Sequence, residues 1–480
     1  MLLRKSSLGS AILSLAVLLT ACAEERAAID RTQPNRLDKT MFQGEWYYGR
    51  TVVDVPGTLT HAFVGENTWQ GAERIRWEIQ DNWLYARRSY ERIKNGEGAT
   101  LDRETSVLID REGKPYLGAI IAAYPIESHF DVRRAYNSTT GEEYNVIEEN
   151  SSDRPWYERR YMRVNWAKNE ATNFDFTVDD VEQDPVAYYV EGTKNPIDCT
   201  HEDCPVIDAP QYDSAGKLIK RGYLDVTNIV MSRPGMTHIP ELHASYPTCW
   251  FFGHELSDCT TEAIKIRHSF WQVDPSHQYV PKKLKGKVTE HFGIFNQERI
   301  TWDGNQGANE RNRQSFAQLH NLWNKWIDDN GDLLAPDKRE GVRPMVFYAV
   351  DWPDDLMPPV RNVGDTWNAI FQRVVAAALG QPSYDGPVFQ ICRSPVEESD
   401  DHALCGETGF KVRLGDIRYS MAVYVPKFYD GFRLLGFGPS NADPLTGETL
   451  SAMAYLYVWN NTVTQQTIEQ LQLLNGDMDP

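Results

Sequence analysis

The chain has 480 residues, of which 41% are hydrophobic, 11% aromatic and 24% charged. A chain of this length and composition can bury more than one core, which excludes global disorder. The 49 Lys and Arg residues are outnumbered by 68 Asp and Glu residues, giving a formal net charge of −19. Because no segregated basic patch is evident, this balance excludes nucleic acid as a partner.

Residues 1–22 have the order of an export signal peptide. Arg4 and Lys5 precede an apolar run from Leu8 to Leu19, and small residues lead to Cys22. The run is shorter than the roughly 20 residues that span a bilayer, and the ending resembles the lipobox of bacterial lipoprotein precursors. We therefore expect Cys22 to become a lipidated N-terminus, followed by a flexible polar tether over residues 23–40. The alternative is an ordinary secretory signal that contains a cysteine.

The residues after Cys22 indicate a location. Ala23 and Glu24 follow it, with no Asp beside the cysteine, which resembles Gram-negative lipoproteins sorted to the outer membrane. We expect an extracytoplasmic protein, in the periplasm or at the cell surface, whose membrane contact is the lipid anchor.

The other six cysteines fall into three pairs that are close in sequence: Cys199 with Cys204, Cys249 with Cys259, and Cys392 with Cys405. An oxidising compartment favours disulfides, so we expect each pair to close a short loop. The alternative at the first pair is a zinc site, because His201, Glu202 and Asp203 lie between its two thiols. The spacing lacks the Cys-x-x-Cys of common structural zinc sites, which favours the disulfide.

The next two sections predict β structure. Ile75, Trp77 and Ile79 alternate with charged residues, and turn signals such as Asn95-Gly96 break residues 41–150 into a β-rich domain. Residues 151–330 predict a second β-rich, disulfide-bearing region, with strands at 186–190, 224–231, 264–273 and 288–302, the last interrupted by a turn at Asn296-Gln297. Apolar residues over 314–327 recur at helical spacing, so this region is expected to end in a helix.

The last section, residues 341–480, mixes helix and strand patterns. A strand at 343–350 is followed by a helical repeat over 360–378 that ends at Gly380. Strands at 387–391 and 417–425, an edge hairpin over 437–450 and a helix at 462–474 complete the predicted succession.

Two segments of this section carry a family resemblance. Asp416 to Tyr419, and the run from Gly438 to Glu448, resemble segments of large bacterial zinc-dependent metalloproteases of metzincin type. The resemblance implies an α/β domain, incomplete in this chain, and an edge strand at Gly438, Pro439 and Ser440 that binds an extended peptide or protein. The expected fold class is therefore α+β: β-rich N-terminal regions followed by the opening strands, helix and edge hairpin of a metzincin-like domain.

Catalysis in that family requires zinc held by His-Glu-x-x-His, in which two imidazoles lie one helical turn apart. No two of the 11 histidines are four residues apart. His254-Glu255 begins the motif, but Asp258 occupies the second ligand position, which indicates a coincidence. We therefore assign no catalytic residue, no metal ligand and no cofactor to this chain, with zinc expected only if a longer chain supplies the missing ligands.

The expected function is that of a membrane-anchored lipoprotein forming the N-terminal portion of a zinc metalloprotease-like protein, not catalytic as supplied. The alternative is a complete, non-enzymatic surface or periplasmic lipoprotein that serves as a binding or scaffold module.

Overall fold

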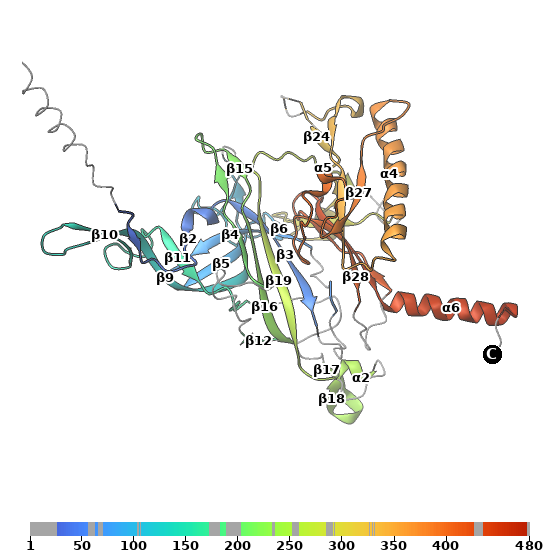
Figure 1. Ribbon diagram of the computed structural model, residues 1–480, viewed down its shortest axis with the longest axis horizontal. Helices are drawn as coiled ribbons and strands as arrows, with labels where there is room; N and C mark the ends of the chain where they lie inside the picture. The colour runs from blue at the N-terminus through green and yellow to red at the C-terminus, as the bar shows by residue number, and fades with distance from the viewer. Residues whose placement is uncertain are drawn as a thin grey trace, which may run out of the picture.

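The computed structural model describes residues 26–55, 63–65, 71–102, 105, 107–171, 183–188, 203–232, 236–251, 259–284, 291, 293–325, 327–328, 330, 332–426 and 435–477. Three sequence features lie outside these residues: Cys22, Cys199 and the motif-like segment 254–258. Within them, a large curled sheet, a second sheet and one long helix are arranged side by side (Figure 1).

The large sheet has twelve strands, all of which come from the first 272 residues. Its main path, in spatial order, is β1 (Ile29–Asp30), β10 (Glu143–Asn150), β9 (Ile120–Tyr136), β5 (Trp83–Arg88), β4 (Glu73–Ile79), β3 (Glu45–Asp54), β19 (Glu262–Gln272), β16 (Tyr223–Ser232) and β12 (Gln183–Tyr188). Three short strands pair beside this path: β2 (Leu37–Asp38), β11 (Tyr161–Val164) and β13 (Val206–Asp208).

Antiparallel pairing of β3 with β19 joins the two β-rich sections expected from the sequence. Tyr48 of β3 lies opposite Phe270 of β19, and their rings stack with centroids 4.8 Å apart. The sheet therefore continues across the boundary placed at residue 150. Its apolar core gathers large side chains from distant parts of the chain, including Trp46, Leu84, Tyr124, Trp166 and Leu224.

The second sheet has seven strands and belongs mainly to residues 345–457. Its path is β23 (Leu319–His320), β31 (Glu448–Tyr457), β28 (Ser420–Val425), β26 (Met345–Val350) and β27 (Phe389–Ser394), all parallel to their neighbours. Two short strands pair antiparallel with β31: β29 (Gly436–Phe437) and β30 (Ser440–Ala442).

Helix α4 (Met357–Leu379) connects β26 to β27 and covers one face of the second sheet, where Met357 and Val360 pack against Ala349 and Ile391. Gly380 ends the helix with φ of 67°, a left-handed conformation that glycine adopts without a Cβ penalty. The predicted helix over 360–378 and its glycine end are both confirmed.

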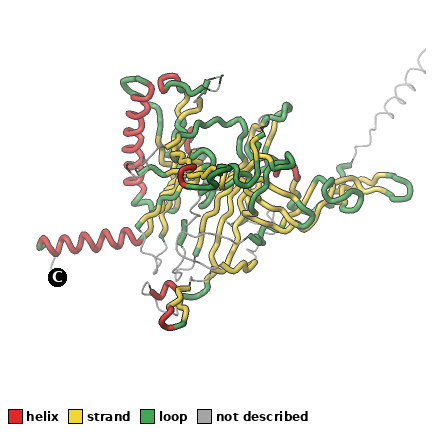
Figure 2. The backbone as a smooth tube through the Cα atoms, turned by 180° about the vertical axis from the view of Figure 1, so that it is seen from behind, coloured by secondary structure: helices red, strands yellow, loops and turns green. Residues whose placement is uncertain are grey.

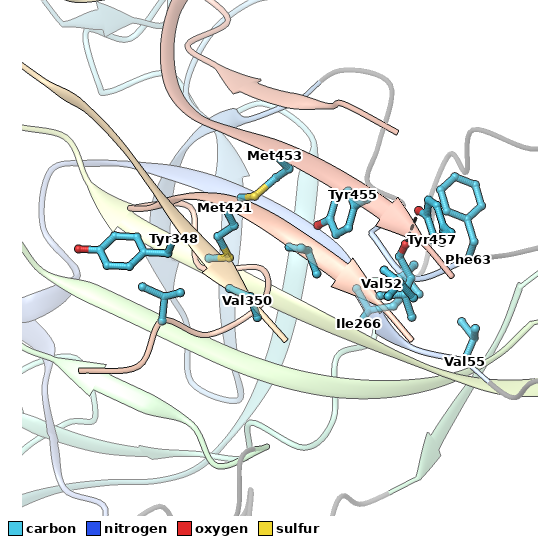
Figure 3. Close-up of a cluster of buried hydrophobic side chains, with 14 of the residues drawn as sticks. Val52, Val55, Phe63, Ile266, Tyr348, Val350, Met421, Met453, Tyr455 and Tyr457 are labelled. Carbon is cyan, nitrogen blue, oxygen red and sulfur yellow. Dashed lines mark hydrogen bonds between the residues drawn. The ribbon is translucent and has the colours of Figure 1, made fainter. Parts of the chain in front are cut away.

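The other face of the second sheet packs against the large sheet (Figure 3). Val52 and Ile266 from the large sheet meet Met421, Met453 and Tyr455 from the second sheet in one buried cluster. The two sheets therefore share a core.

Short strands complete the β structure. A four-stranded sheet contains β20 (Lys283–Leu284), β22 (Arg313–Ala317), β21 (Asn296–Thr301) and β6 (Ile93–Lys94). Two-stranded ladders are formed by β7 (Thr100–Leu101) with β8 (Leu108–Ile109), β14 (Gln211–Tyr212) with β15 (Leu218–Lys220), β17 (Met236–Ile239) with β18 (Ala244–Pro247), and β24 (Trp323–Lys325) with β25 (Glu340–Val342).

The helix predicted at 314–327 is wrong. This stretch forms β22, β23 and β24, which pair with four different strands: β20, β21, β31 and β25. A short apolar run fits either period, and here the partners supplied by distant segments decide the outcome. The turn predicted at Asn296-Gln297 is also wrong, because both residues begin β21 and pair with β22.

The expected α+β class, with its metzincin-like domain, is contradicted as well. Strands make up 42% of the structure and helices 15%, and the architecture is mostly β. The helical share is small because, in the described part of the chain, the long helices α4 and α6 (Trp459–Asn475) are accompanied only by short ones. These are the α-helices α2 (Thr248–Phe251) and α5 (His402–Cys405) and the 3-10 helices η1 (Lys39–Phe42), η2 (Pro240–Leu242), η3 (Glu310–Asn312) and η4 (Pro336–Lys338). The sheets therefore pack mainly on each other.

Two elements project from the body. The β9–β10 hairpin extends on one side, and α6 extends on the other, away from α4 and from both sheets (Figure 2). The hairpin is closed by a turn at Thr140-Gly141, where Gly141 has φ of 73°.

Candidate functional site

Of the three residues expected to form an edge strand, only Ser440 lies in a strand, β30, whereas Gly438 and Pro439 connect β29 to β30 alongside β31. The Met453 N–H donates to the Pro439 carbonyl at 2.8 Å, and Ser440 pairs with Ala452. In an antiparallel ladder the backbone groups of successive residues alternate in direction. Because Pro439 points its carbonyl toward β31, the N–H and C=O of Gly438 point away from the ladder.

The two ends of this edge differ in how they are covered. Gly71 lies against Ser440, such that a Cβ on Gly71 would be 3.1 Å from the Ser440 carbonyl oxygen. The Ser440 hydroxyl donates to Gln318 Oε1 at 3.0 Å. Gly438, by contrast, is exposed. The accessible stretch of the edge is therefore centred on Gly438 rather than on Ser440.

The turn after the edge strand is built around Asp443. Its carboxylate accepts hydrogen bonds from Leu445 N–H at 2.9 Å and Thr446 Oγ1 at 2.9 Å. Arg74 of β4 forms a bidentate ion pair with the same carboxylate, in which its Nε–H donates to Oδ1 at 2.9 Å. This turn therefore connects the second sheet to the large sheet.

Burial and charge act in opposite directions on Arg74. Burial is the largest single effect and disfavours its charged form, but Asp443, Tyr47 and Glu45 together outweigh it and raise the pKa of Arg74. Glu45 lies 3.2 Å from the same guanidinium and adds to the stabilisation. Burial, and then the charge of Asp443, also raises the pKa of the neighbouring Tyr47, whose hydroxyl donates to Asp443 at 3.4 Å.

A cavity of about 610 Å³ opens beside this cluster. Its walls include Tyr47, Tyr279, Arg74, His277 and Glu448, contributed by both sheets and by the segment that follows β19. His277 Nε2 lies 2.8 Å from the Glu448 carboxylate. The cavity suits a small polar group, but its charged side chains are largely paired with one another, so it has no pronounced charge selectivity.

The other segment that carried the family resemblance, Asp416 to Tyr419, lies at the interface between the sheets. Arg418 pairs with Asp416, and its guanidinium lies 3.4 Å above the Tyr223 ring of the large sheet. Ile417 N–H donates to Ser269 Oγ at 3.2 Å. These residues hold the two sheets together.

Four cysteines with described side chains are disulfide-bonded. Cys392 and Cys405 form a disulfide with Cα atoms 5.6 Å apart, buried in the core shared by the two sheets. Cys204 and Cys259 are each disulfide-bonded as well. The side chains of Cys199 and Cys249 lie outside those described.

No group of three or more His, Cys, Asp and Glu side chains is placed to hold a metal ion within the described ranges. Over those ranges, no helix has both the length and the apolar character needed to cross a bilayer.

No family model, curated protein or solved structure matches the chain. The sequence patterns placed Ser440 in an edge strand beside β31, as the structure has it, but gave no sign of the Arg74–Asp443 and His277–Glu448 pairs. Their partners are 369 and 171 residues apart, and no local pattern in the sequence connects them.

Proposed function

We propose that the chain is a lipid-anchored, extracytoplasmic protein that binds extended peptide segments along the open edge of its second sheet. The observation that carries the proposal is the exposed Gly438, whose N–H and C=O point away from β31. An incoming strand can pair with such groups by strand addition. Because backbone pairing supplies most of the contact, we expect modest affinity and broad peptide specificity.

We also propose that the chain shares ancestry with zinc metalloproteases, because the sequence from Gly438 to Glu448 resembles theirs. We do not propose that it cleaves peptides, because no two histidines of the chain have the one-turn spacing that a His-Glu-x-x-His helix needs. Incubation with unfolded casein, with and without a chelator, should release no fragments. Chelator-sensitive cleavage would contradict the binding proposal and restore a catalytic one.

Two substitutions at one position test the binding edge. Gly438→Pro removes the outward N–H while leaving the carbonyl, and should weaken binding of a labelled alternating Thr-Val peptide at least tenfold in fluorescence anisotropy. Gly438→Ala is the matched control, because its Cβ would lie 3.7 Å from the Met453 carbonyl oxygen, an ordinary contact. Equal binding by both variants would refute pairing at Gly438.

The anchor requires a separate experiment. Replacing Cys22 with Ser should block lipidation, so that the exported protein leaves the membrane fraction or accumulates as an unprocessed precursor. If the variant is still matured and sediments with membranes like the parent, the lipoprotein part of the proposal fails while the peptide-binding part is unaffected.

A further inference from the structure

The N-terminal segment is attached to the β9–β10 hairpin from Arg26 onward. Strand β1 pairs in parallel with β10, with Ile29 opposite Val146. The Asn145 side chain donates an N–H to the Arg26 carbonyl at 2.8 Å. Because β10 begins at the turn of the hairpin, its parallel neighbour leads toward that turn when it is followed backwards along the chain. The chain therefore joins the body at the turn end of the hairpin.

Further contacts hold the same segment. The Arg31 N–H donates to the Ile147 carbonyl at 2.9 Å, and the Gln33 N–H donates to the Glu149 carboxylate at 2.7 Å. Strand β2 and helix η1 follow, within the stretch expected as a tether. From Arg26 onward, the segment is therefore bound to the body at several points.

Chain length then limits the distance between the hairpin and the anchor. Cys22 is four residues before Arg26. A polypeptide spans at most about 3.6 Å per residue, so the two Cα atoms are no more than about 14 Å apart in any conformation. A lipidated Cys22 lies at the bilayer surface, because its acyl chains are buried in the hydrocarbon. The turn end of the hairpin is therefore confined to the neighbourhood of the lipid headgroups.

The side chains at this end suit such surroundings. Tyr136 ends β9 and Tyr144 lies near the start of β10, with exposed fractions of 41% and 46%. Tyrosine is enriched at membrane–water interfaces, which accommodate both its apolar ring and its polar hydroxyl. Arg26 and Arg134 are exposed nearby and present guanidinium groups, which pair well with phosphate.

The charge of this end differs from that of the whole chain. The anchor end, comprising residues 26–39 and 131–163, contains ten Arg and Lys residues and nine Asp and Glu residues, whereas the chain has a net charge of −19. A bilayer surface that contains anionic lipids therefore repels the acidic remainder of the molecule but not the anchor end.

We infer that the turn end of the β9–β10 hairpin contacts the headgroups of the bilayer that holds the lipid anchor, an inference that rests on the lipidation of Cys22 proposed above. The partner is a lipid surface, because covalent attachment keeps that surface within reach of the hairpin in every molecule. The hairpin and the second sheet lie at opposite ends of the body (Figures 1 and 2). This orientation places the peptide-binding edge away from the membrane.

Photocrosslinking to lipid tests the contact. The full chain, exported and processed in a bacterial host, is reconstituted into vesicles of phosphatidylethanolamine and phosphatidylglycerol. The crosslinker p-benzoylphenylalanine in place of Tyr144 should give at least fivefold more lipid adduct, measured by mass spectrometry, than the same crosslinker in place of Ile219. Ile219 is the matched control, because it is 66% exposed on a different hairpin, β14–β15. Equal adduct at both positions would overturn the inference.

A longer connection tests the argument from chain length. Inserting about 20 Gly and Ser residues between Glu25 and Arg26 adds a flexible span of about 25 Å, so the adduct at position 144 should fall at least threefold. An unchanged yield would overturn that argument.

Flotation of the vesicles checks the anchor independently. A chain that floats with the vesicles but gives no lipid adduct at position 144 would refute the hairpin contact while leaving the anchor intact. A chain that does not float would refute the lipid anchor, and this inference with it.

Discussion

Replacing Asp443 with Ala should strongly destabilise the protein. The carboxylate is only 1% exposed and is the principal partner of Arg74, whose side chain is 15% exposed. Removing it leaves a largely buried guanidinium with Glu45 at 3.2 Å as its remaining ion-pair partner. It also removes the acceptor for the Leu445 N–H.

The size of the effect follows from these contacts. Breaking a buried ion pair by removing one partner costs about 3–5 kcal/mol, because the other charge stays buried. Glu45 reduces that loss, whereas the lost turn hydrogen bond adds about 1 kcal/mol. We therefore expect Asp443→Ala to lower the free energy of unfolding by about 3–4 kcal/mol.

Urea unfolding followed by tryptophan fluorescence measures this change. Glu310→Ala is the control, because the Glu310 carboxylate pairs with Arg313 at a site where its side chain is 77% exposed, and no measurable change is expected. The double replacement Asp443→Leu with Arg74→Met should recover at least half of the loss, since no unpaired charge remains. A loss below about 1 kcal/mol for Asp443→Ala would refute the reasoning that this pair connects the sheets.

Other predictions concern pH, the disulfide and a turn. Burial lowers the pKa of His268 to about 3, so the folded state binds a proton less readily than the unfolded state and stability should fall by about 2 kcal/mol from pH 6.5 to pH 5. In urea titrations at these pH values, His268→Gln should reduce the slope of the unfolding free energy against pH by the equivalent of up to one proton. An unchanged slope would contradict the lowered pKa of His268. Replacing Cys392 and Cys405 with Ala should cost about 3 kcal/mol of chain entropy, seen as a lower urea midpoint, while an unchanged midpoint would count against a structural role. Gly447→Ala should destabilise the protein by at least about 1 kcal/mol more than the control Gly113→Ala. Both glycines have positive φ, but only a Cβ at Gly447 would lie 2.5 Å from a backbone oxygen. Equal losses of stability in thermal melts would contradict this.

Local patterns predicted some elements well. The helical repeat that ends at Gly380 gave α4, and alternation at Ile75, Trp77 and Ile79 gave β4, because each pattern matches one period over its whole length. Residues 314–327 were predicted wrongly because their strand partners lie elsewhere in the chain, including Glu448 and Thr449 of β31. Tertiary pairing overrides the period of so short an apolar run.

The candidate site, too, could be predicted from the sequence only in part. Gly438 was expected on an edge because its segment resembles the edge strand of metzincin-type metalloproteases, whereas the turn chemistry that follows it indicates only a hairpin. The connection between Arg74 and Asp443 depends on how the large sheet curls beside the second sheet, and no local rule relates residues so far apart. Sequence therefore located the strand but not the contacts that support it.

The shared core has a consequence for how the chain reaches its native state. The Tyr457 hydroxyl donates to the Val64 carbonyl at 2.8 Å across 393 residues, and β3 lies between β4 and the much later β19. High contact order of this kind slows folding, because long loops must close before their contacts contribute. During synthesis the early strands emerge with unpaired edges and apolar faces and must wait for about 200 further residues before β19 is available. If the chain is exported as proposed, it should depend on holdase chaperones before it folds, and their depletion should cause aggregation without any loss of stability in the finished protein.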